Sequence, residues 1–458
     1  MNMKKILLLV IVSIALHQVQ AQVEYGNVLI KNGTIITITK GNLENTDVLI
    51  KDGKVSQIGK NLPAPAGYKV IDATNKFVMP GIIDAHSHIA LNAINEYSNA
   101  ITPEVWTGDE LNPFDISIYR ALAGGVTVSH ALHGSGNAIG GQSETIKHRY
   151  GTFDMDVLRM ENAPRTIKFA LGENPTTHGR RDGLQPQTRM GVEFIIREAF
   201  TEAKHYQETW DKYNKEKLVK GFRGAPPTYS LRLQTLSDII KGDIILHCHS
   251  YRADEINMLL KVCKDFGIKR LVFQHVNEGF KVAPELAAAG AMASVFADWW
   301  AYKLEVYYST AYNAAILTRN GVVTSINSDS GELIRHLYHE AAKTQKYGGL
   351  SDDEALSLIT INPAKQLGID SRVGSIEVGK EADIAIFQNH PLSIYAIPMM
   401  TLVDGVVRFD REKDADDMRI YVDPKEVVEI PTLHTEDLSN DNCLRGTELL
   451  AGNLFGLN

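Results

Sequence analysis

Histidine pairs after apolar runs are the first chemical feature of this chain. His86 and His88 form a His-x-His pair after one apolar run, and His247 and His249 form a second pair after another. Alternation along an extended strand places both members of a pair on one face. Imidazole nitrogens on one face suit Zn²⁺ and similar divalent ions, and no cysteine is needed. The pairs therefore predict part of a metal site.

Three further candidates also stand at the ends of strand-like runs. They are Glu173, His275 and Asp329. Each residue alone has an ordinary interpretation as a solvated acid or a histidine at the edge of a core. If the strands are parallel and close into a barrel, their carboxyl ends meet at one mouth. We therefore expect these side chains to share the metal site with the histidine pairs.

The candidate ligands must be positioned by the strands and helices that alternate between about residues 81 and 370. Residues 253–266 carry apolar side chains at helical spacing and end at Gly267, and predicted strands lie on both sides of them. Repeated strand–helix units of this kind predict a parallel sheet. About 290 such residues suit an eightfold (β/α)8 TIM barrel, which typically needs ~250. The pattern alone also allows a doubly wound open sheet.

Short strands and turns dominate on both sides of this region. Asn-Gly and Asp-Gly dipeptides, such as Asp52-Gly53, separate β-favouring runs and favour hairpins. Neither end offers much core alone. We therefore expect residues 22–80 and 371–410 to form one small β-sandwich domain beside an α/β barrel domain at residues 81–370.

The first 21 residues have the pattern of a secretory signal peptide. Lys4 and Lys5 precede a short apolar stretch, and Val19-Gln20-Ala21 suits cleavage before Gln22. The stretch is too short for the ~20 residues that a membrane-spanning helix needs. We therefore expect an exported protein, periplasmic or secreted, with no membrane attachment after cleavage. The acidic extension at residues 411–458 has no predicted role.

Composition excludes several classes of partner. The 458 residues include 47 basic and 55 acidic side chains, for a net charge of −8. This balance argues against a nucleic-acid surface or a polybasic membrane patch. Three cysteines cannot make a disulfide scaffold in so long a chain. A small-molecule substrate is the expected partner, and a homo-oligomer is left open.

The run Gly81-Ile82-Ile83-Asp84-Ala85-His86-Ser87-His88 resembles the signature of the amidohydrolase superfamily. The Ile-Asn-Pro-Ala segment at residues 361–364 and the segment at residues 374–383 are also typical of it. The resemblance covers nearly the whole mature chain and is strongest to the imidazolonepropionase-like group. It implies a metal-dependent (β/α)8 barrel, a β-sandwich built from both ends of the chain, and hydrolysis of C–N bonds.

The resemblance also implies a role for each candidate ligand. His86 and His88 match the ligands on the first strand, and His247 and His275 match those on the fifth and sixth strands. Asp329 matches the eighth-strand aspartate, which binds metal and accepts the proton of the attacking water. A metal lowers the pKa of its bound water to ~7, so that hydroxide is available at neutral pH.

The fourth strand departs from the family pattern. Many relatives with two metals use a carboxylated lysine there, whereas we assign Glu173 to that place. Lys168 precedes Glu173 by an odd number of residues, which turns it to the opposite face of a continuous strand. Glu173 would bridge two zinc ions, the favoured number; with one ion it would contact substrate or support the ligands instead.

Other polar residues near the predicted ligands are candidates for contacts with substrate. His249 shares the face of His247 and is the alternative ligand on that strand. The glycine-rich run at residues 133–142 either lets backbone approach a ligand or forms a hairpin loop. The candidates for substrate contacts are Gln142, His178, Arg180, Arg181, His249, Tyr251 and Arg252.

The leading hypothesis is an exported amidohydrolase that cleaves a cyclic amide, a small peptide or an N-acyl amino acid, in the manner of a prolidase. Deaminase relatives usually carry a glutamate three residues after the fifth-strand histidine, where this chain has Ser250. A lactonase or phosphotriesterase is left open, because the same activated water attacks esters. A metal-free scaffold is disfavoured, because such proteins lose their ligands and this chain keeps a full set.

Overall fold

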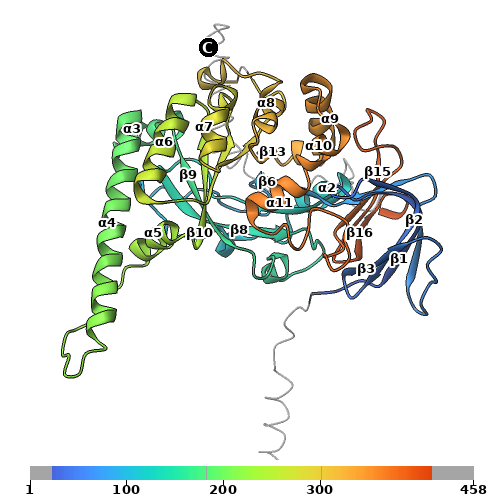
Figure 1. Cartoon of the computed structure of the whole chain (residues 1–458), viewed down its shortest axis with the longest axis horizontal. Coiled ribbons are helices and arrows are strands. Elements are labelled where there is room, and N and C mark those ends of the chain that lie inside the picture. Colours follow the sequence, from blue (N-terminus) through green and yellow to red (C-terminus); the bar gives the residue numbers. More distant parts are fainter. Residues whose placement is uncertain (1–22, 182, 301, 415–458) are drawn as a thin grey trace, which may run out of the picture.

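The computed structural model describes residues 23–414 apart from residues 182 and 301, and it contains two eight-stranded sheets (Figure 1). The predicted signal peptide and nearly all of the C-terminal extension lie outside the described residues. Figure 1 shows the sheet that carries β1 to β3, β15 and β16 at one end of the molecule and the long helix α4 at the other. The barrel lies between them.

The barrel consists of consecutive strands, each paired with the next. They are β6 (Ile82–Ser87), β7 (Val126–Ala131), β8 (Ile139–Lys147), β9 (Arg165–Ala170), β10 (Ile244–Ser250), β11 (Leu271–His275), β12 (Met292–Val295) and β13 (Thr324–Ile326). The last strand returns to the first: the backbone N–H of Asp329, just after β13, donates to the carbonyl of His86 at 3.1 Å. This contact brings the two ends of the sheet together, so the barrel is nearly closed and the predicted fold class is confirmed.

One barrel strand departs from the expected alternation. β8 runs antiparallel to both β7 and β9, whereas the other neighbours in the barrel are parallel. The loop at residues 132–138 is shorter than the dozen or more residues that a parallel crossover needs. The glycine-rich run at residues 133–142 therefore reverses the chain as a hairpin does.

Helices cover the outside of the barrel and follow its strands. Residues 253–266 form α6 as predicted, and Gly267 ends it in the left-handed conformation at φ 74°. The helices are α2 (Ile116–Ala123), α3 (Glu173–Arg181), α4 (Arg189–Glu216), α5 (Leu231–Lys241), α6 (Ala253–Phe266), α7 (Ala283–Ala288), α8 (Asn313–Arg319), α9 (Leu337–Gly348), α10 (Asp352–Ser357), α11 (Ile361–Leu367) and α12 (Arg411–Asp414). None of the helices described here has the length and apolarity needed to cross a bilayer.

The second sheet joins the two ends of the chain. Its strands are β1 (Val28–Ile36), β2 (Asn42–Lys51), β3 (Lys54–Gly59), β4 (Lys69–Asp72), β5 (Phe77–Pro80), β14 (Ile384–Phe387), β15 (Pro398–Val403) and β16 (Val406–Asp410). β5 pairs antiparallel with β14, which links the N-terminal strands to the C-terminal ones. The two groups also share one apolar cluster, in which Ile30 and Ile50 are buried with Ile384 and Leu402. Neither end has to bury its apolar face alone.

Candidate metal centre

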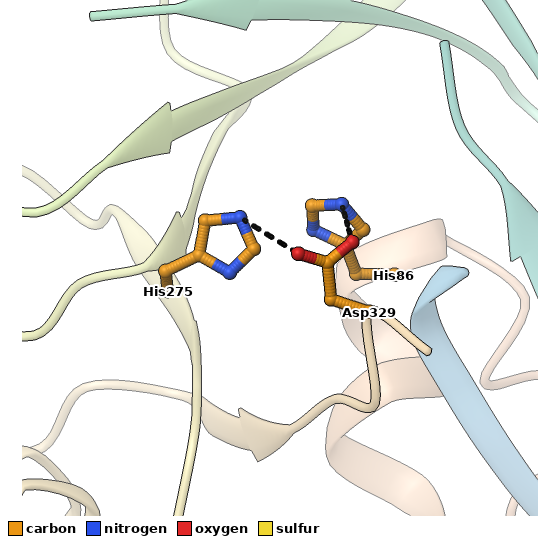
Figure 2. Close-up of side chains that lie close together, drawn as sticks. All are labelled: His86, His275 and Asp329. Carbon is orange, nitrogen blue, oxygen red and sulfur yellow. Dashed lines mark ion pairs between the residues drawn. The ribbon is translucent and has the colours of Figure 1, made fainter. Parts of the chain in front are cut away.

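Three predicted ligands meet at the mouth of the barrel, where their strands end (Figure 2). One ligand atom from each of His86, His275 and Asp329 lies within 4.8 Å of the other two, and all three side chains are buried. The Nε2 atom of His86 is 3.3 Å from Oδ1 of Asp329, and that of His275 is 3.8 Å from Oδ2. His88 joins this cluster, because its Nε2 lies 3.2 Å from Oδ1 of Asp329.

The backbone at two of these ligands is held in an uncommon conformation. His275 has φ 69° and Asp329 has φ 46°, in the left-handed region that non-glycine residues seldom adopt. Such a conformation costs of order 1–3 kcal/mol and persists where the surrounding structure holds it, often at functional sites. Here it turns both side chains from their strand ends into the barrel mouth.

Hydrogen bonds on the far side of two imidazoles set their tautomers. The side-chain oxygen of Gln274 lies 3.1 Å from Nδ1 of His86, and the carbonyl of Leu132 lies 2.8 Å from Nδ1 of His88. Both oxygens only accept hydrogen bonds, so each Nδ1 carries the proton. The lone pair of each Nε2 therefore lies on the side that faces Asp329, as a metal ligand requires.

Electrostatics keep His86 and His275 neutral and Asp329 ionised. Burial lowers the pKa of His86 well below its usual value, and the charge of Lys168 lowers it further. Burial also lowers the pKa of His275 to about 3. Burial alone would raise the pKa of the Asp329 carboxyl, but the facing His88 and His275 outweigh it and lower that pKa to about 2. These are the protonation states that bind metal.

Several buried polar atoms of this cluster find no hydrogen-bond partner among the described residues. They are both carboxylate oxygens of Asp329 and both ring nitrogens of His249 and of His275. Leaving such atoms unsatisfied is costly, and clusters of them in native proteins call for an explanation. A divalent cation would satisfy them, and the mixed nitrogen and oxygen donors are those that Zn²⁺ accepts. The residues present therefore fit a metal ion.

The prediction that Lys168 faces away from the candidate ligands is wrong. Its Nζ lies 3.2 Å from Nε2 of His86, inside the barrel. Glu173 instead begins α3, and its backbone N–H donates to Oε1 of Glu305 at 2.9 Å. β9 ends at Ala170 and Gly172 adopts φ 77°, so the alternation does not continue across this turn. Lys168 rather than Glu173 therefore takes the fourth-strand place in the cluster.

The structure also separates the two histidines of β10. The ring of His249 lies 4.7 Å from that of His275, whereas the ring of His247 packs 4.5 Å from that of His130. Nδ1 of His247 accepts from the side-chain nitrogen of Gln274 at 2.9 Å. His247 lies two residues earlier on the same face and thus one layer deeper in the barrel. It is His249 that reaches the level of His275.

The predicted substrate contacts divide between the cluster and its surroundings. The buried Tyr251 ring stacks at 5.4 Å on His275. The half-buried Arg252 pairs with Asp254 at 2.8 Å and, with Glu173 and Arg180, lines a cleft of about 560 Å³. Of these candidates, Tyr251 is the one that contacts a ligand.

Three other candidates are held elsewhere by their own partners. His178 stacks on Tyr97 at 4.5 Å, and a guanidinium nitrogen of Arg181 lies 3.0 Å from its Nδ1. Gln142 accepts from Arg165 at 2.9 Å, at the amino end of β9. That end of β9 is opposite its carboxyl end, and the side-chain nitrogen of Gln142 donates to the carbonyl of Pro103 at 3.2 Å. The structure thus places Gln142 away from the cluster.

Sequence reasoning missed two residues next to the ligands. Gln274 hydrogen-bonds both His86 and His247, and Lys303 lies with its Nζ 4.5 Å from the ring centre of Tyr251. Gln274 directly precedes the predicted ligand His275 on β11, and this adjacency could have identified it from the sequence. Lys303 lies in a loop between β12 and β13 whose sequence has no motif, and only the fold brings it to this site.

Comparison with known proteins extends these observations. The sequence model of the protein family described as "Amidohydrolase family" matches residues 301–412 of this chain. A solved structure of an amidohydrolase from Thermotoga maritima MSB8 is 32% identical, covers 84% of this chain and 100% of its own, and superposes with a TM-score of 0.77. Amidohydrolase tasK of Hapsidospora irregularis is 31% identical over 80% of this chain, which spans only 40% of that protein's length.

Weaker likenesses extend to proteins with other printed activities. A 5-methylthioadenosine/S-adenosylhomocysteine deaminase of Moorella thermoacetica is 22% identical over 79% of this chain and 85% of its own length. An imidazolonepropionase of Thermoplasma volcanium is 23% identical over 75% and 84%. The second likeness agrees with the group to which the sequence motifs point.

Proposed function

This chain belongs to the amidohydrolase family, and on that premise we propose that it is a metal-dependent hydrolase that cleaves the amide bond of a small substrate. The observation that carries the proposal is the cluster at the barrel mouth. There, neutral imidazoles face the ionised Asp329, whose buried oxygens have no hydrogen-bond partner among the described residues.

The residues that would hold the metal follow from this geometry. His86, His88 and Asp329 are one set, and His249 with His275 is the other. Lys168 lies with its Nζ 3.2 Å from Nε2 of His86 and would help to hold two ions once its amine is carboxylated. We propose two zinc ions on this basis. When bound, such an ion lowers the pKa of water and polarises a substrate carbonyl.

Asp329 is the residue that moves the proton. Its carboxylate is ionised and points into the centre of the cluster, so it can accept a proton from the attacking water. The same group, once protonated, can return that proton to the leaving nitrogen. The buried rings of Tyr251 and His275 exclude bulk water from this exchange.

Deamination is the second candidate, because a relative that covers most of this chain is named as a deaminase. The glutamate that deaminases usually carry three residues after the fifth-strand histidine is missing by either assignment. Counted from His247 the position is Ser250, and counted from His249 it is Arg252. Arg252 pairs with Asp254, and its guanidinium stays protonated, so it cannot take the place of that glutamate. Amide hydrolysis is therefore favoured over deamination.

One experiment separates the candidates. The purified chain, loaded with zinc and checked for metal content, is offered dipeptides, N-acyl amino acids, cyclic amides, adenosine derivatives and lactones. We expect metal-dependent release of amine or ring opening from an amide. Turnover confined to adenosine derivatives with release of ammonia would establish the deaminase instead, and a protein without affinity for zinc, manganese, iron or cobalt would refute both.

We also propose export, which rests on the N-terminal pattern alone. N-terminal sequencing of protein from the native host is expected to begin at Gln22. A chain that retains residues 1–21 in the cytoplasm would contradict it.

A further inference from the structure

Lys303 is a buried cation beside the ligand cluster. The residue is 5% exposed, and its Nζ donates to Oδ1 of Asn174 at 2.7 Å. Asn174 is held in turn, because its Nδ2 donates to Oγ of Ser135 at 2.6 Å. The ammonium group is therefore fixed in place by neutral partners.

No carboxylate within the described chain forms an ion pair with Lys303. The neighbouring Glu305 accepts from Arg189 at 2.5 Å and from the backbone of Glu173 instead. A buried charge without a counter-charge is strongly destabilising. Such a departure from the rule that buried charges are paired is expected mainly where a ligand supplies the missing charge.

The position of Lys303 relates it to the reaction centre. Its Nζ lies 4.5 Å from the ring centre of Tyr251, and that ring stacks on His275 and meets the edge of His249. The Tyr251 ring thus contacts both the ammonium and two candidate ligands. The charge is also close enough to lower the pKa of His249 and of His275, after the larger effect of burial.

We propose that Lys303 binds a carboxylate of the substrate and thereby selects acids over neutral amides. In an N-acyl amino acid or a dipeptide, only the amide nitrogen and one carbon separate the scissile carbonyl from the carboxylate. The carbonyl would face Asp329 and the carboxylate would face Lys303, with the two linking atoms beside the edge of the Tyr251 ring. A carboxylate suits a single ammonium with one amide neighbour, whereas phosphate sites favour several donors or the fork of arginine.

This inference rests on the proposed amide hydrolysis, and the test compares each N-acyl amino acid that is hydrolysed with its C-terminal amide. We expect the wild type to prefer the acid. Lys303→Met is expected to lower kcat/KM for the acid by about 100-fold, as for loss of a charge-assisted hydrogen bond, and for the amide by less than about threefold. Lys303→Arg keeps the charge and should retain part of the preference.

The matched control is Lys281→Met. Lys281 also lies over a tyrosine, 4.2 Å from the ring centre of Tyr308, but it is more exposed and already pairs with Glu278. This variant should keep the wild-type ratio of acid to amide. Equal losses on acid and amide in Lys303→Met, with an unchanged melting temperature, would overturn the proposal.

A binding measurement separates this inference from the proposed function. N-acetyl-L-alanine and its amide are titrated calorimetrically into zinc-loaded wild type and Lys303→Met. We expect the acid to bind the wild type more tightly, and the difference to vanish in the variant, whether or not the compound is hydrolysed. Equal affinity of the wild type for acid and amide overturns the role of Lys303 even if amides are cleaved.

Discussion

The Nζ of Lys168 lies 3.2 Å from the Nε2 of His86, deep inside the barrel, where both side chains are almost entirely shielded from solvent. A lysine ammonium donates this contact, and it occupies the lone pair that His86 would offer to a metal. Metal binding therefore requires Lys168 to give up its proton. Reaction of the free amine with carbon dioxide, with release of one further proton, would convert it into a carbamate, which is an anionic oxygen ligand beside His86.

Lys168→Met should lower the metal content by about one ion per chain, because methionine fills the volume but offers no oxygen. The measurement is elemental analysis of the zinc-loaded, gel-filtered protein. Lys346→Met, at an exposed position on α9, is the control and should keep the wild-type content. Two ions in Lys168→Met would show that Lys168 is no bridge.

Asp329→Asn should abolish turnover and leave the fold intact. The amide keeps the shape of the carboxylate but neither accepts a proton nor carries the charge that the facing imidazoles stabilise. We expect kcat to fall by at least about 10³-fold while the far-ultraviolet circular dichroism stays unchanged. A variant that retains more than a tenth of wild-type kcat would refute the role of Asp329 as the proton acceptor.

The two histidines of β10 should respond differently to substitution. His249→Gln removes a ring beside His275 and should weaken zinc binding by about 10-fold or more. His247→Gln changes a ring that packs on His130 and contacts Gln274, so its effect on zinc should be several-fold smaller. Competition with a chelator of known affinity measures both. The reverse order would return the ligand role to His247.

Much of this architecture could be predicted from local patterns. Strands whose ends carry His86, His275 and Asp329 were recognisable from short apolar runs, and their convergence follows from the geometry of a barrel. The β-favouring runs at both ends of the chain, neither of which offers much core alone, predicted the sheet that joins them. The antiparallel direction of β8 was harder to predict, because it depends on the length of the preceding loop.

Other parts of the site depend on details that a sequence pattern does not carry. Side chains alternate between the two faces only along an unbroken strand. Because the chain turns at Gly172, the spacing between Lys168 and Glu173 does not show which face Lys168 occupies. Two residues on one face, such as His247 and His249, differ in depth, which only the stagger of neighbouring strands decides. Lys303 comes from a loop, and its place beside Tyr251 is a purely tertiary result.

A buried ion cluster connects the barrel to the second sheet and should control stability rather than chemistry. Lys147, at the end of β8, is fully buried and contacts Glu381 at 2.6 Å, Asp383 at 3.0 Å and Asp404 at 2.5 Å. Burial alone would lower the pKa of Lys147, but these three acids outweigh it and raise that pKa above its usual value. The lysine therefore stays charged and neutralises acids that would otherwise repel one another.

Lys147→Met should lower the free energy of unfolding by ~3–5 kcal/mol, because it leaves the buried Asp383 without a counter-charge. Arg149 and Arg372 still pair with Asp404 and Glu381. Denaturant titration of the metal-free protein measures this loss. Lys212→Met, which removes an exposed partner of Glu216 at 3.9 Å, should cost less than ~1 kcal/mol. Zinc content and the preference for acid over amide should be unchanged in folded Lys147→Met, because the ion cluster around Lys147 lies at the interface between the barrel and the second sheet. A loss no larger than that of Lys212→Met would show that the contacts between barrel and sheet do not depend on this lysine.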